Sequence, residues 1–101
     1  DTYPTEVTLE EMPNTILEAF RDEKNPQIKQ MAQQATQALK SRQYTVAHGL
    51  LQQLISLPNL TQEQRDLISG SVITVAENLQ KAAESGNVQA QQHLQRQTIV
   101  K

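Results

Sequence analysis

Apolar residues recur every three or four positions along most of the chain, which is the spacing of one face of an α-helix. The pattern is clearest in the second half, where the apolar positions are Ile68, Val72, Val75, Leu79 and Ala82. Thr61 and Gln64 have the spacing of a capping box before this stripe, and Gly86 suits the left-handed conformation that often ends a helix. We therefore predict a long helix over 62–85. Gly70 lies inside it, where we expect either a closely packed neighbour or a kink.

A second apolar-rich segment precedes this helix and pairs with it. Residues 44–57 have the pattern of a helix that ends before Pro58, because the residue before a proline is pushed away from helical backbone angles. A turn at 58–61 then brings the two helices together as an antiparallel hairpin. We expect Leu54 and Leu79 to lie in the core of this pair, almost inaccessible to solvent.

Three more helices complete the prediction, over residues 13–23, 26–41 and 88–97. The strongest start signal among them is Asn25 followed by Pro26, a capping residue and a proline that fits the first helical turn. Residues 1–12 are expected to form an extended lead-in and 98–101 a tail. The whole chain, 1–101, is therefore predicted to be one all-α domain, with about five helices in a compact bundle built on antiparallel hairpins.

Composition and charge exclude several classes of partner. The chain has 101 residues and a formal net charge of -2, and its nine Lys and Arg residues form no cluster, so we expect no nucleic-acid partner. No apolar run approaches the roughly 20 residues that span a bilayer, so we expect no membrane span in this chain. The sequence begins at Asp1 without a methionine. We expect either an exported or periplasmic protein whose signal segment has been removed, or a piece of a longer protein.

The candidate chemical groups have structural explanations. His48 and His93 fall on different predicted helices without carboxylate or histidine company, so we expect both at the surface or rim and predict no metal site. Glu63 and Asp66 fall in the first turn of a predicted helix, where negative charge is favoured by the helix dipole. No nucleophile elbow or phosphate-binding glycine loop is present. We therefore predict no catalytic residue and no cofactor, and a protein that is not an enzyme.

Part of the chain resembles a known repeat family. Ala38-Leu39 precedes a polar turn, followed by Gln43-Tyr44-x-x-Ala47, an apolar helix and Leu57-Pro58-Asn59. On these residues the span 35–59 resembles a tetratricopeptide unit, although Arg42-Gln43 stand where that family usually has a glycine. The Thr61-x-Glu63-Gln64 helix start and the Gly86-Asn87 break are also similar to small uncharacterised exported bacterial helical domains. The resemblance implies helical hairpins and carries no enzymatic activity.

The tetratricopeptide resemblance also suggests a contact surface. In arrays of that family the first helix of each pair lines the ligand groove, so the polar stripe of the 26–41 helix becomes a candidate: Gln30, Gln33, Gln37 and Lys40. We predict a non-enzymatic helical module that uses this stripe to bind a protein partner or a second copy of itself. Three alternatives remain open: a purely solvated stripe, a spacer domain of a longer exported protein or lipoprotein, and a small-molecule-binding or enzymatic helical domain with a pocket between helices.

Overall fold

The computed structural model describes residues 7–86 and 92–94 of the chain. Within these ranges the protein is all-α, as predicted, and contains no strand. The helices are α1 (Met12–Ala19), α2 (Pro26–Lys40), α3 (Tyr44–Ile55) and α4 (Gln62–Glu84), and residues 92–94 are also helical. The rest of the helix predicted over 88–97, the tail 98–101 and residues 1–6 of the lead-in lie outside the described residues.

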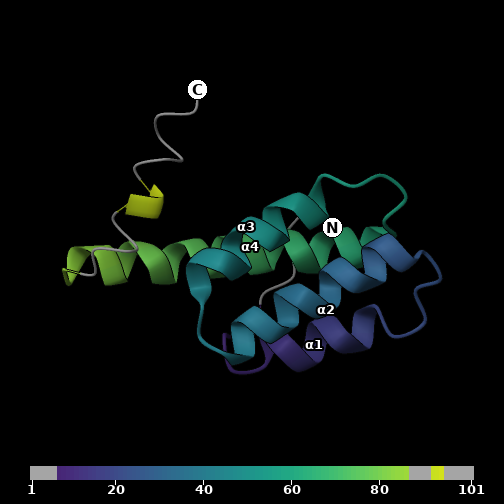
Figure 1. The fold of residues 1–101 in the computed structure, drawn as a ribbon, viewed down its shortest axis with the longest axis horizontal. Helices are drawn as coiled ribbons and strands as arrows, with labels where there is room; N and C mark the ends of the chain where they lie inside the picture. The colour runs from purple at the N-terminus through teal and green to yellow at the C-terminus, as the bar shows by residue number, and fades with distance from the viewer. Residues whose placement is uncertain (1–6, 87–91, 95–101) are drawn as a thin grey trace.

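Consecutive helices run antiparallel (Figure 1). The neighbouring pairs, which include α1 with α4, close the four helices into a ring. The helix α2 packs against α1 and α3, while α4 packs against α3 and α1. Among these four helices, no Cα atom of α1 lies within 8 Å of one in α3, and the same holds for α2 and α4, so each helix has two direct neighbours. The C-terminal half of α4 extends beyond the other three helices (Figure 1). The outer sides of α1 and α2 are therefore both open to solvent along the line where these two helices pack together.

The predicted start signals of α2 and α4 are formed as side-chain caps. The Asn25 side-chain oxygen accepts hydrogen bonds from the backbone amides of Gln27 (3.0 Å) and Ile28 (3.4 Å). At the start of α4, the Thr61 hydroxyl accepts a bond from the Gln64 amide, and the Gln64 side chain accepts one from the Thr61 amide, both at 3.0 Å. These bonds satisfy amides that a helix start leaves without an intrahelical partner.

Two of the helices are followed by a residue with left-handed backbone angles, that is, with positive φ. After α4, Gly86 has a φ of 95°, as its position in the sequence predicts. After α2, the left-handed residue is Arg42, with a φ of 59°. The Gln43 amide bonds to the Ala38 carbonyl at 2.9 Å and the Arg42 amide to the Leu39 carbonyl at 3.1 Å. This pair of bonds is the Schellman motif, so Arg42 adopts a conformation for which glycine is more usual.

Two helices are shorter than the sequence pattern indicates. The helix α1 ends at Ala19 rather than near residue 23, because the backbone tightens into bonds that span three residues, from Arg21 to Glu18 and from Glu23 to Phe20. The helix α3 ends at Ile55 rather than 57, since the residues before Pro58 also form bonds of this tighter kind. In both cases apolar residues continue past the end of the regular helix.

One core joins all four helices. Leu54 is fully buried and Leu79 is 3% exposed, which confirms the two core positions predicted from the sequence. Two hydroxyl groups are buried with them, and each bonds to a carbonyl one turn earlier in its own helix: Thr36 to Ala32, and Ser71 to Leu67, both at 2.8 Å. Next to Ser71, Gly70 is buried within an uninterrupted α4.

Candidate interaction surface

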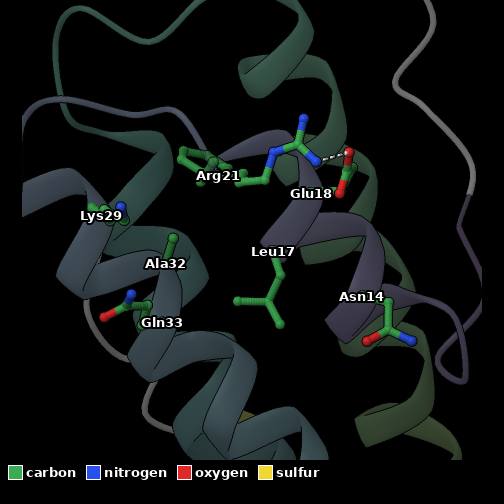
Figure 2. A pocket seen from close by; sticks show the side chains of 8 residues that line it. Asn14, Leu17, Glu18, Arg21, Lys29, Ala32 and Gln33 are labelled. Carbon is green, nitrogen blue, oxygen red and sulfur yellow. Dashed lines mark ion pairs between the residues drawn. The ribbon is translucent and has the colours of Figure 1, made fainter.

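A groove of about 450 Å³ runs between α1 and α2 and is open to solvent. Five of its lining residues come from α1 and the turn after it, and three from α2: Asn14, Leu17, Glu18, Phe20, Arg21, Lys29, Ala32 and Gln33. Figure 2 shows Leu17 pointing into the space between the two helices, with Lys29 and Gln33 across from it. The groove therefore has an apolar centre and a polar rim.

The spacing of apolar residues on α1 explains why Leu17 lies in this groove. Met12, Ile16 and Phe20 recur every four residues and are buried against the core. Leu17 follows Ile16 directly, so it lies about 100° further around the helix, at the edge of the buried stripe. It is one of the large apolar side chains left exposed, at 37%. The apolar face of α1 is therefore wider than the part of it that packs against the core.

The wall of the groove formed by α2 is recessed, because the buried residue that lines it is small. Ala32 is only 1% exposed and presents a single methyl group to the groove. Lys29 and Gln33 each follow a buried residue of α2, Ile28 and Ala32, so each lies at the edge of the buried stripe of its helix, as Leu17 does on α1. A larger side chain at position 32 would fill the space beside Leu17.

The charges at the rim are solvent-exposed. The Arg21 guanidinium forms an ion pair with the Glu18 carboxylate at 3.0 Å, and about two-thirds of each side chain is exposed. Such an exposed pair contributes about 0–1 kcal/mol, so it can exchange partners at little cost. Within the described ranges Lys29 forms no ion pair inside 4.0 Å. The groove mouth therefore offers a cation to an incoming acidic group.

The predicted stripe of α2 is only partly associated with this groove. Gln30, Gln33, Gln37 and Lys40 are all exposed. Gln33 lines the groove, whereas the other three lie outside it. The sequence pattern did not indicate that Leu17 is exposed, although the crowding of Ile16, Leu17 and Phe20 on a short helix was a signal that one of them would be left outside the core.

The two histidines contact each other, which corrects the prediction for His48. The His48 side chain is buried, at 4% exposure, and its Nδ1 lies 2.8 Å from Nε2 of His93. The rings meet edge to face, with centroids 5.0 Å apart and planes at 79°. Burial, and then the nearby His93, lower the pKa of His48 below its ordinary value of 6.5. The apolar periodicity of α3 could not show this, because the contact depends on a segment 45 residues later.

Other hollows and clusters in the described part of the chain are less organised. An open hollow of about 540 Å³ lies between α1 and α4, lined in part by Glu18 and Glu63, and another of about 400 Å³ lies beside the turn before α1. Across the described ranges, no group of three or more His, Cys, Asp or Glu residues is placed to hold a metal ion. None of the described helices has the length and apolar character required to cross a membrane.

Comparisons of the chain with protein-family models, with curated proteins and with solved structures found no match.

Proposed function

We propose that this protein is a non-enzymatic interaction module that binds an amphipathic helical segment of a partner protein in the groove between α1 and α2. The observation that carries the proposal is Leu17, an exposed apolar side chain at the centre of a groove with charged and amide groups at its rim. Protein interfaces have this composition, with an apolar centre that loses its water and a polar rim that stays wet.

The residues of the groove specify the chemistry of the occupant. An apolar side chain of the partner would pack on Leu17 between the two helices, in the manner of a helix laid into a groove. An acidic side chain one turn away would meet Lys29, which has no ion pair in the described structure. Gln33 adds an amide that can donate to or accept from the partner. The preferred ligand is therefore a helix with an apolar stripe bordered by Asp or Glu.

The tetratricopeptide resemblance of residues 35–59 also supports a partner-binding surface on the α2 side of the molecule. In that family the first helix of a pair lines the ligand groove, and α2 holds the equivalent place in the hairpin it forms with α3. Of the stripe Gln30, Gln33, Gln37 and Lys40, only Gln33 lines the groove, so we propose Gln33 as the contact residue of the stripe and expect the other three, which lie outside the groove, to contribute little. A second copy of the chain is the competing occupant.

The test is a display selection with the full chain as bait and random peptides of about 15 residues, the length at which an isolated helix becomes marginally stable. Selected peptides are then titrated against the parent chain, Leu17→Lys and Val46→Lys. Val46 is the matched control, because it is also an exposed apolar residue, 50% exposed, but lies on α3 away from the groove. Sedimentation of the chain alone measures self-association.

We expect selected sequences with an apolar stripe and adjacent acidic residues. Leu17→Lys should weaken their binding about tenfold or more, since it places a charge at the centre of the contact, and Val46→Lys should change it less than about twofold. Equal effects of the two substitutions would contradict the proposal. So would a concentration-dependent dimer that Leu17→Lys abolishes, because the occupant would then be a second copy.

A further inference from the structure

The contact between His48 and His93 joins two distant parts of the chain. His48 is on the inner side of α3, in line with the buried residues Ala47 and Leu51. His93 belongs to the segment 92–94, which follows α4 in the sequence. The hydrogen bond at 2.8 Å therefore holds this segment against α3, and the edge-to-face packing of the rings covers His48 from solvent.

The protonation state of the two rings decides whether this bond can form. With both imidazoles neutral, one facing nitrogen donates and the other accepts. A single added proton preserves the bond, since one ring still offers a lone pair. When both rings are charged, both facing nitrogens carry hydrogens and no acceptor remains between them. The contact then changes from a hydrogen bond to a repulsion between two cations in a partly buried place.

The surroundings offer no compensating charge in the described structure. The helix α3 contains no Asp, Glu, Lys or Arg, and the segment 92–94 contains none either. The neighbouring α2 carries Lys29 and Lys40, both exposed. The neighbouring α4 carries Glu63, Arg65, Asp66, Glu77, Lys81 and Glu84. None of these groups contributes to the shift in the pKa of His48, which has burial and His93 as its causes.

We propose that the His48–His93 pair is an acid-sensitive latch, which holds the segment 92–94 on α3 near neutral pH and releases it when both imidazoles are protonated. Release exposes the covered part of α3 around His48 while the four-helix core stays folded. The latch is separate from the groove between α1 and α2, to which neither histidine contributes. Its opening would thus create an additional, pH-dependent surface on a different helix.

The test is a pH titration of the full chain by NMR, following both histidine rings, the Leu94 amide and the magnetisation transfer between the two rings. Circular dichroism at each pH monitors the helices. The matched variant is His93→Gln, whose amide oxygen can accept a bond from neutral or protonated His48 and does not titrate. His48→Gln is the reciprocal variant, and it remains informative if His93→Gln does not fold.

We expect His48 to titrate below pH 6.5 and the Leu94 amide signal to move with the same midpoint. Below that midpoint the magnetisation transfer between the two rings should vanish, while the helical circular dichroism signal persists. In His93→Gln, the acid-induced shift of the Leu94 amide should be lost. In His48→Gln, where His93 still precedes Leu94, the contact between the side chains at positions 48 and 93 should persist in acid. The latch is refuted if His48 titrates at or above 6.5, if the rings remain in contact when both are charged, or if Leu94 responds to acid in His93→Gln as it does in the parent chain.

Discussion

Gln64 joins the start of α4 to the end of α1 through Glu23. Its side-chain nitrogen donates to the Glu23 carboxylate at 3.0 Å and approaches the Ala19 carbonyl at 3.4 Å. Its side-chain oxygen closes the capping box with Thr61, and the residue is buried, at 6% exposure. One amide therefore satisfies a helix start and fixes the helix that forms one wall of the groove.

This double role predicts the cost of losing Gln64. Gln64→Ala removes the bond from the Thr61 amide to the Gln64 side chain, which is one half of the capping box, together with the bond to Glu23, so the free energy of unfolding should fall by about 1–3 kcal/mol. Thr61→Ala removes only the other half, the bond from the Gln64 backbone amide to the Thr61 hydroxyl, and should cost about 1 kcal/mol. Chemical denaturation of both variants and of the double variant measures this difference. If Gln64→Ala were no more destabilising than Thr61→Ala, the bond to Glu23 would have no energetic role.

Core truncations should be far more damaging than surface ones. Leu54→Ala and Leu79→Ala each leave a cavity in the shared core and should lower the free energy of unfolding by about 2–5 kcal/mol. Val46→Ala is the control, because its side chain is half exposed and the change should stay within about 0.5 kcal/mol. Thermal and denaturant melts compare the three variants. Parent-like melting of either leucine variant would show that the assigned core is wrong.

Stability should decrease as the solution is acidified below pH 6.5. Because the pKa of His48 is lowered in the folded protein, the unfolded chain binds more protons between that lowered value and 6.5. The contribution of His48 to stability is therefore fully present above about pH 6.5 and is lost as pH falls through this window. Denaturant unfolding of the parent chain and of His48→Gln at several pH values isolates the contribution of His48. A pH slope unaffected by the substitution would contradict the assignment.

The elements of this fold were predictable where a signal is local. Asn25 with Pro26, and Thr61 with Gln64, have cap spacings that depend on a few consecutive residues, and both caps are present. The bond from Gln64 to Glu23 spans 41 residues, and the sequence does not indicate it. The candidate groove is similar: Gln33 could be placed on an exposed face, but its proximity to Leu17 follows only from how α1 packs on α2.

The position of Gln33 relative to Gln37 predicts how far the contact surface extends along α2. Gln33→Glu introduces a negative charge at the groove edge, so binding of an acidic amphipathic peptide should weaken about threefold to tenfold. Gln37→Glu introduces the same charge one turn further on, outside the groove, and should have a smaller effect. Calorimetric titration of both variants compares them. Equal losses would indicate that the whole exposed side of α2 forms the contact.

The most direct test of the groove as a binding site is the affinity of a selected acidic peptide for Lys29→Glu and Lys40→Glu. Both substitutions change the net charge equally, but Lys29 lines the groove and Lys40 lies eleven residues further along α2, about 16 Å away at 1.5 Å per residue. That separation exceeds the screening length of about 8 Å at physiological salt. We predict that Lys29→Glu weakens binding about tenfold and Lys40→Glu by less than about twofold. Equal weakening by the two substitutions, or no weakening by Lys29→Glu, would contradict the assignment of the groove.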